Sequence, residues 1–401
     1  MRLFEPLKLK NGVVIKNRFM KAAMSEIMGD HSHRPTPKLI NLYKNWADGG
    51  VGLMITGNVM IDSRALGEIG NIVIENHHNL SLLKQWAMSG NSNGAQTWVQ
   101  LNHPGRQSPK IVSKQPLAPS AVPLEGPNAF AFNPPRAMTI SEIHNVIGRF
   151  ARSALIVKEA GFAGVEIHAA HGYLLDQFLS PRTNRRNDQY GGSLENRMRI
   201  IGEIYFAIRK KVGSNFPVAI KINSEDYQAG GFSESDSLKV IQRLSEYGID
   251  LIEISGGDYE SPAMESTSSG PFFIDYAKKA KQLVSAPLSL TGGFRTVSGM
   301  EKALENSETE MIGLARPFAL NPKLPNQIKN GKIKNINVEH LSTGINMLDK
   351  KMGSYIGLSY YEMLMNRIAK NKVIKPTKNA WIPLAFALRT QGISSFLPNR
   401  G

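Results

Sequence analysis

Two histidines and a tyrosine stand within six residues at the end of an apolar segment. Residues 163–168 predict a buried strand that ends at His168, and His171 and Tyr173 follow with only alanines and a glycine between them. Imidazoles three residues apart can ligate a metal ion or donate hydrogen bonds to an oxygen on which negative charge develops. A nearby phenol can donate a proton, because its pKa in a free peptide is about 10. The alternative is a purely structural role, in which both histidines are buried and bond to backbone carbonyls.

Short apolar runs alternate with amphipathic stretches along most of the chain. Such runs are typical of a parallel sheet that is covered on its faces, and the alternation predicts a (β/α)8 TIM barrel, with a doubly wound open sheet as the second choice. The expected strands are 19–24, 51–56, 95–101, 163–168, 218–222, 249–255, 287–291 and 310–315. Chemistry in a TIM barrel is placed where strands end, so His168, His171 and Tyr173 are expected at the barrel mouth.

Several segments lie outside the strand–helix repeat. Alternation around Asn11-Gly12 predicts a β-hairpin under the barrel floor. Residues 103–137 are rich in Pro, Ser and Gly and predict an excursion over the catalytic face after the third strand. We expect a barrel domain over residues 1–325. Residues 326–401 are expected to form a basic extension, packed on the barrel or trailing from it, with helices near 360–371 and 383–392.

The composition of the 401 residues excludes several classes of site. There are no cysteines, which excludes disulfides, thiolate zinc sites and cysteine-ligated iron–sulfur clusters. No run reaches the length of a membrane span, and the first residues lack the apolar stretch of a signal peptide, so we expect an unexported, cytoplasmic protein. A homo-oligomer is compatible with the sequence.

Net charge is +15, and residues 322–401 carry thirteen Lys and Arg against three Asp and Glu. We interpret this basic tail as a solvated face. It lacks the interleaved basic and aromatic residues of a nucleic-acid platform, so no nucleic-acid partner is expected.

The motif around the two histidines resembles the old yellow enzyme family of flavin-dependent ene-reductases, which are (β/α)8 barrels around FMN. The likeness spans residues 3–324. It rests on ordered matches at 17–18, 100–106, 168–173, 177–181, 184–193, 292–295 and 315–317.

The resemblance implies a small-molecule substrate with an activated alkene. His168 and His171 would hold the carbonyl oxygen of an α,β-unsaturated carbonyl compound, and Tyr173 would donate a proton to the α-carbon. Hydride would pass from NAD(P)H through flavin N5 to the β-carbon.

The resemblance also implies the contacts to FMN. The ring would be lined by Ala23, Met24, Ser25, Gly57, Gln100 and Lys221, and the phosphate would be bound by Gly292, Gly293, Arg295, Ala315 and Arg316. We expect Lys221 to face the flavin rather than to serve as a buried salt-bridge partner. No metal is expected. Asn184, Arg186, Asp188, Tyr190 and Arg197 are expected to brace the structure, with Ser193 capping the next helix.

Two other functions stay open at this point. One is a metal-dependent hydrolase on the same barrel, with His168 and His171 as ligands and Asp176 nearby. The other is a binding protein that has lost catalysis and works through its basic tail.

Overall fold

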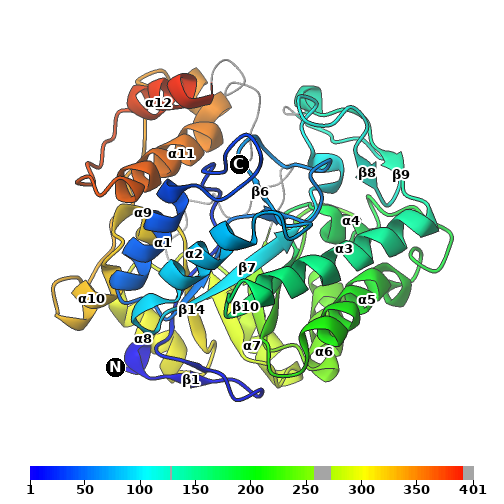
Figure 1. Ribbon diagram of the computed structural model, residues 1–401, viewed down its shortest axis with the longest axis horizontal. Coiled ribbons are helices and arrows are strands. Elements are labelled where there is room, and N and C mark those ends of the chain that lie inside the picture. The colour runs from blue at the N-terminus through cyan, green and yellow to red at the C-terminus, as the bar shows by residue number, and fades with distance from the viewer. Residues whose placement is uncertain (127–128, 257–271, 392–401) are drawn as a thin grey trace.

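Parallel strands close into a barrel in the computed structural model, which describes residues 1–126, 129–256 and 272–391 (Figure 1). The barrel strands are β3 (Phe19–Lys21), β4 (Leu53–Ile55), β7 (Gln96–Asn102), β10 (Gly164–Ala169), β11 (Val218–Asn223), β12 (Leu251–Ser255), β13 (Leu288–Thr291) and β14 (Met311–Leu314). Each lies within an expected run or within one residue of it. The last strand pairs with the first, Leu314 opposite Lys21. This closure confirms the TIM barrel and excludes the open sheet.

Helices surround the barrel and cover its outer face (Figure 1). They are α1 (Pro37–Asp48), α2 (Leu80–Gly90), α3 (Ile140–Glu159), α4 (Leu174–Leu179), α5 (Leu194–Val212), α6 (Glu234–Tyr247), α7 (Ile274–Leu283), α8 (Val297–Glu305) and α9 (Arg316–Leu320). Local signals fix their ends. The Ser193 side chain accepts a hydrogen bond from Asn196 N at the start of α5, as expected, and Gly248 ends α6 in the left-handed conformation.

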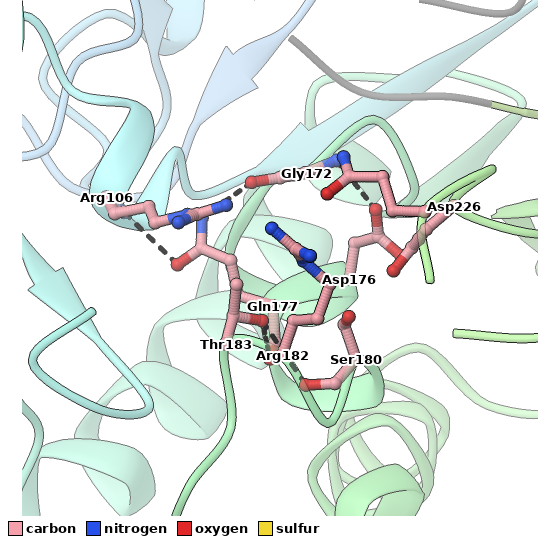
Figure 2. Close-up of a pocket in the computed structure, with 9 residues that line it drawn as sticks. Arg106, Gly172, Asp176, Gln177, Ser180, Arg182, Thr183 and Asp226 are labelled. Atoms are coloured by element: carbon pink, nitrogen blue, oxygen red, sulfur yellow. Dashed lines mark hydrogen bonds between the residues drawn. The ribbon is translucent and has the colours of Figure 1, made fainter. Parts of the chain in front are cut away.

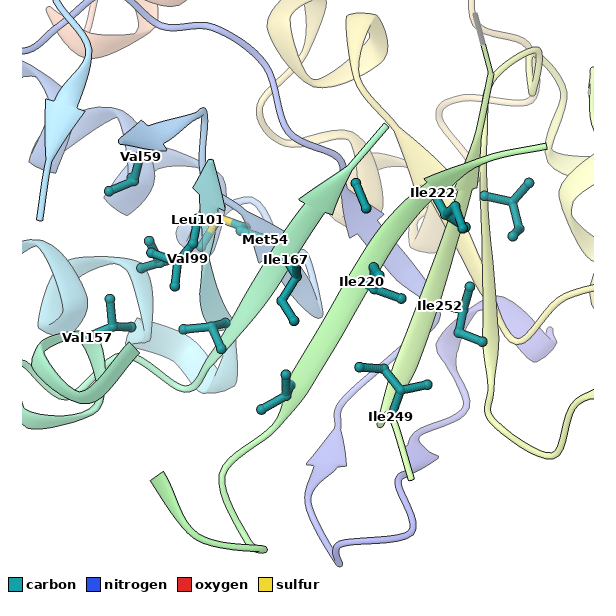
Figure 3. Packing of buried hydrophobic residues seen from close by; sticks show 14 of the residues in the cluster. Met54, Val59, Val99, Leu101, Val157, Ile167, Ile220, Ile222, Ile249 and Ile252 are labelled. Carbon is teal, nitrogen blue, oxygen red and sulfur yellow. The ribbon is translucent and has the colours of Figure 1, made fainter. Parts of the chain in front are cut away.

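Alternate residues of each strand have different tasks. The outward side chains, such as Ile167, Ile220 and Ile252, are fully buried and belong to the main apolar cluster shared with the helices (Figure 3). Burying one such side chain stabilises the fold by about 1.5–3 kcal/mol. The inward side chains near the mouth are polar instead, and Glu166 and Lys221 are among them. A second apolar cluster fills the lower barrel and contains Trp98.

The expected hairpin belongs to this lower cluster. Strands β1 (Leu7–Lys8) and β2 (Val14–Ile15) pair antiparallel, with Leu7 opposite Ile15, and both residues pack in the cluster. The excursion after β7 contains η3 (Gly105–Gln107), β8 (Leu117–Ala118), η4 (Ala129–Ala131) and β9 (Arg136–Ala137). The remaining short elements are η1 (Arg2–Phe4), β5 (Val59–Met60), β6 (Ile72–Val73) and η2 (Ser92–Gly94).

The C-terminal part is helical and packs on the barrel. It contains α10 (Leu324–Lys329), α11 (Asn346–Ala369) and α12 (Trp381–Gln391), and α11 contacts α1, α9 and α12. The expected helices are present, although α11 begins fourteen residues earlier than the pattern indicated. Helix α10 runs across the expected domain boundary at 325, which stays a prediction. Among the described helices, none combines the length and the apolar composition that crossing a bilayer requires.

Candidate active site

The structure brings His168, His171 and Tyr173 together at the mouth of the barrel. His168 lies near the end of β10, and the other two belong to the turn that leads into α4. The ring centroid of His168 is 5.1 Å from that of His171 and 4.8 Å from that of Tyr173, and both pairs meet edge to face. His168 and Tyr173 are each 3% exposed. Three groups able to donate hydrogen bonds therefore share one small volume.

The turn that carries these residues has an unusual backbone. His171 has φ of 60°, and Gly172 follows with φ of 73°. A left-handed conformation at a residue other than glycine is held only where the surroundings impose it. Here Gly172 N donates to Asp176 Oδ2 at 2.6 Å, and Asn223 Nδ2 donates to the same oxygen at 3.0 Å.

Asp176 thus braces the turn, which is a different task from the metal ligation considered above. Among the described residues, no group of three or more His, Asp or Glu side chains could hold a metal ion. The metal-dependent hydrolase is therefore not favoured.

Hydrogen bonds fix the orientation of both imidazoles. Ala170 N donates to His168 Nδ1 at 3.3 Å, so the neutral ring carries its proton on Nε2. His171 Nε2 lies 2.7 Å from Ser255 Oγ, and His171 N donates to Asn223 Oδ1 at 3.3 Å. Sequence reasoning missed Asn223 and Ser255. Both are the last residues of neighbouring strands, β11 and β12, and that position was the available signal.

The excursion after β7 supports the same turn. Gln177 accepts a bond from Arg106 N at 3.1 Å and donates through Nε2 to Gly172 O at 2.6 Å. These residues and Asp226 line a small cavity beside the turn (Figure 2). The backbone oxygen of His103 accepts from Leu174 N at 3.0 Å, and burial lowers the pKa of the His103 ring to about 4.

A layer of buried charged and amide groups lies inside the barrel below the imidazoles. Gln100 Nε2 donates to Glu166 Oε1 at 2.7 Å, and Lys221 Nζ lies 3.0 Å from Glu253 Oε1. Burial, and then the negative charge of Glu253, raise the pKa of Glu166 well above its usual range.

The preference against a buried salt bridge at Lys221 was wrong. Glu253 stands directly opposite Lys221 in the β11–β12 register, and sequence alone does not reveal that pairing. The ion pair leaves a flavin contact of Lys221 as a proposal.

The ends of the first two barrel strands form one wall of a second cavity. Ser25 and Gly57 both line it, and the Ser25 hydroxyl bonds to Glu68. Gly57 N donates to Glu26 Oε1 at 3.1 Å, and Tyr43 OH donates to the same oxygen at 2.6 Å. A Cβ on Gly57 would stand 2.4 Å from Met24 O, so only glycine fits. Ala23 precedes Met24 and packs partly on the lower cluster.

Glu26 also forms an ion pair with a buried lysine, which sequence reasoning missed. Lys21 Nζ lies 3.4 Å from Glu26 Oε1 and 4.6 Å from the centroid of the Trp46 ring. Burial raises the pKa of Glu26 and lowers that of Lys21.

The ends of β13 and β14 bring two guanidinium groups near each other. Gly292 and Gly293 follow β13 with φ of 127° and 81°. Arg295 lies two residues further on, and Arg316 begins α9 directly after Ala315. Burial lowers the pKa of Arg295, and the positive charge of Arg316 lowers it further. The negative charge of a bound phosphate would offset both effects on the pKa, so these residues fit the phosphate of FMN.

The residues expected to brace the loop before α5 do so. Arg186 pairs with Asp188 and donates through Nη1 to Pro119 O at 2.9 Å, which ties the excursion to this loop. Asn184 donates to Tyr190 O at 2.7 Å, and Arg197 pairs with Asp236.

Comparisons with known proteins agree with this architecture. The model of the NADH:flavin oxidoreductase / NADH oxidase family matches residues 2–335. The chain is 40% identical over 355 residues to "NADH-dependent flavin oxidoreductase iliE" of Hypocrea jecorina (strain QM6a), covering 80% of this chain and 88% of the relative. It is 39% identical over 355 residues to the protein of the same name from Neonectria sp. (strain DH2), covering 80% of this chain.

The chain spans 46% of that second relative, or about half its length. Among solved structures, the old yellow enzyme homologue from Zymomonas mobilis superimposes with a TM-score of 0.73 at 25% identity. That match covers 84% of this chain and 95% of the other.

Proposed function

The chain belongs to the NADH:flavin oxidoreductase / NADH oxidase family, and on that premise we propose that it is an FMN-dependent enzyme which uses NADH or NADPH to reduce activated alkenes. The name of one relative supports the choice of a nicotinamide electron donor, since the iliE protein of Hypocrea jecorina is described as NADH-dependent. The reduction of an α,β-unsaturated carbonyl compound is the specific reaction proposed. Hydride from the reduced flavin would go to the β-carbon of that compound.

The imidazole pair is the observation that carries this proposal. His168 presents an N–H at Nε2, and the ring of His171 lies 5.1 Å away, held by Ser255. When the β-carbon accepts hydride, negative charge grows on the carbonyl oxygen. Preorganised donors aimed at that oxygen stabilise the transition state. Because the backbone and Ser255 already hold the rings, little reorientation is needed during the reaction.

Tyr173 is proposed as the proton donor to the α-carbon. Its ring is almost fully buried and lies 4.8 Å from that of His168. A neutral phenol can donate its proton when the enolate forms. The separation between Tyr173 and His171 along the turn lets one side chain hold the oxygen while the other reaches the carbon.

The remaining residues are proposed to hold the cofactor. Arg295 and Arg316 would bind the phosphate beside Gly292, Gly293 and Ala315. The ring would lie between the end of β3 and the buried polar layer. There, Ala23, Met24, Ser25, Gly57, Gln100 and Lys221 are the proposed contacts. Lys221 Nζ is already paired with Glu253 Oε1 at 3.0 Å, so we propose that Lys221 acts near the flavin through its directed N–H groups.

Reconstitution followed by half-reactions tests the proposal. The purified protein should bind FMN, turn yellow and bleach when NADH or NADPH is added without oxygen. A panel of enones, enals, maleimides and nitroalkenes should then restore the oxidised spectrum. Protein that cannot be reconstituted with FMN, or reduced protein that no activated alkene reoxidises, would refute it. Stoichiometric zinc in place of flavin would revive the hydrolase.

A further inference from the structure

The loop between β5 and β6, residues 61–71, brings a buried carboxyl group to one of the proposed flavin contacts. The Ser25 hydroxyl donates a hydrogen bond to Glu68 Oε1, and Asn71 Nδ2 donates to the same oxygen at 3.0 Å. Glu68 is 2% exposed, and Asn71 is also buried. Ser25, Gly57 and Glu68 line one small cavity at the ends of the first two barrel strands.

The position of Glu68 is fixed by bonds on both sides of it. Asn71 Oδ1 accepts a hydrogen bond from Glu68 N at 2.9 Å, so Asn71 binds both the backbone and the side chain of Glu68. Gly29 N donates to Gly70 O at 3.0 Å, which joins the loop to the segment that begins at Ser25. The carboxyl group therefore meets the Ser25 hydroxyl in a defined geometry.

The residue next to Ser25 has separate partners. Glu26 Oε1 accepts hydrogen bonds from Gly57 N at 3.1 Å and from Tyr43 OH at 2.6 Å. These bonds hold the backbone of the segment from the side of β4, whereas Glu68 holds the hydroxyl of Ser25 from the loop. Glu68 thus has one task that Glu26 does not share.

We propose that Glu68 is a positioning residue for the flavin: its carboxyl group takes the hydroxyl hydrogen of Ser25 and leaves the Ser25 oxygen as an acceptor toward the ring. This inference rests on the proposed function, in which Ser25 contacts the ring. A serine hydroxyl has one hydrogen to donate and two lone pairs with which to accept. Once that hydrogen is bonded to Glu68, the same oxygen can only accept.

An oxygen that only accepts distinguishes the two redox states of the flavin. Reduction adds an N–H group to the ring, so a fixed acceptor stabilises the reduced form relative to the oxidised form. Without Glu68, the Ser25 hydroxyl would be free to rotate and to donate to the unprotonated nitrogens of the oxidised ring. The bond to Glu68 therefore sets the balance between the redox states.

Three variants separate the orientation of the hydroxyl from the charge of the carboxyl group. Glu68→Met keeps the length of the side chain and removes the acceptor oxygen. Glu68→Gln removes the charge and keeps a carbonyl oxygen that can accept from Ser25. Glu75→Gln is the control, because it makes the same change of charge at a carboxyl group that bonds to Ser63 N at 3.1 Å and pairs with Arg149.

The redox equilibrium of FMN bound to the full-length protein tests the proposal. Anaerobic reduction by xanthine and xanthine oxidase beside a reference dye gives the ratio of reduced to oxidised flavin at a fixed potential. We expect Glu68→Met to lower this ratio roughly 3–10-fold. Glu68→Gln should restore it to within about twofold of wild type, and Glu75→Gln should leave it unchanged. In a Ser25→Ala background, Glu68→Met should have little further effect, since the two residues act as one unit.

Three results would overturn the inference. The ratio could be unchanged in Glu68→Met with FMN still bound, or Glu68→Met and Glu68→Gln could shift it equally, which would make charge the cause. The shift could also persist in full in the Ser25→Ala background. Thermal melting reports the fold of each variant. If Glu68→Met does not fold, a wild-type ratio in Ser25→Ala would overturn the inference on its own. Wild-type protein that binds no FMN would instead refute the proposed function, and the inference with it.

Discussion

The mouth of the barrel and the proposed phosphate end are assembled in opposite ways. The mouth takes His168, His171 and Tyr173 from one strand and the turn behind it. The phosphate end takes Arg295 from the loop after β13, and the next arginine from the start of α9, after β14. Residues 334–336 of the C-terminal extension then bond to the backbone at Arg295 and Val297. One region is local in sequence, and the other exists only after the whole chain has folded.

This difference indicates which property of the enzyme a substitution in each region should change. The mouth depends on a strained turn, because His171 is held at a φ of 60° by the Asp176 and Asn223 bonds around it. The phosphate end depends on long-range packing that brings like charges together. We therefore expect variants of the mouth to change rate at constant cofactor affinity. Variants of the phosphate end should change cofactor affinity at constant rate.

Loss of one imidazole should give the largest effect. His168→Ala or His171→Ala should lower kcat/KM for an enone by about 10²–10³, the usual consequence of losing one donor to a developing oxyanion. The FMN dissociation constant should stay within about twofold of wild type, a margin well below one hydrogen bond. Stopped-flow reoxidation of the reduced holoenzyme measures the rate.

His144 offers the control for these variants. It is an exposed histidine that contacts Tyr190 outside the mouth, so His144→Ala should retain the wild-type rate. A comparable loss of rate in His144→Ala, or none in the mouth variants, would break the distinction between the two regions.

His103, which supports the mouth through its backbone, should make the stability of the fold depend on pH. Burial lowers the pKa of His103 to about 4 from its ordinary 6.5. Between pH 6.5 and pH 4, His103 is therefore protonated in the unfolded chain and neutral in the folded state. The stability present above pH 6.5 is lost as pH falls toward 4, by up to roughly 3 kcal/mol.

Urea denaturation between pH 8 and pH 4.5 measures this loss. The charge of Asp62 raises the pKa of His103, whereas the charges of Arg149 and Arg64 lower it. The comparison therefore uses proteins in which these three residues are unchanged. His103→Asn should be less stable at pH 8 and should show a flatter profile below pH 6.5. Parallel profiles for the two proteins would show that His103 does not titrate as described.

Removal of one charge at the phosphate end should have an effect of similar or smaller size. Arg295→Gln should weaken FMN binding about 10–100-fold, since a hydrogen bond to a charged group contributes about 1.5–3 kcal/mol. Riboflavin binding should be unchanged, and so should turnover at saturating FMN. Equal losses for both flavins would place Arg295 outside the phosphate site.

The sequence predicted what local patterns encode. Every barrel strand was found within a few residues of its expected bounds, because an apolar run bounded by polar turns is a local signal. The cap at Ser193 and the left-handed Gly248 were visible for the same reason. The close approach of His168, His171 and Tyr173 followed from their spacing at a strand end.

What the sequence could not predict depends on register and on remote packing. The Lys221–Glu253 pair requires β11 and β12 to align at those residues. The hydrogen bond between His171 and Ser255 joins residues 84 positions apart in the chain. The bond from Ile336 N to Arg295 O joins a tail that carried no motif to the loop after β13, and only the folded chain brings the two together.

Isotope labelling of the product tests the central claim most directly. The holoenzyme would reduce an α-substituted enone with deuterated NADH in ordinary water, and then with ordinary NADH in D2O. The account predicts deuterium at the β-carbon in the first case and at the α-carbon in the second, on opposite faces of the former double bond. Tyr173→Phe should slow delivery to the α-carbon. Deuterium from NADH at the carbonyl carbon, with an allylic alcohol as product, would contradict it.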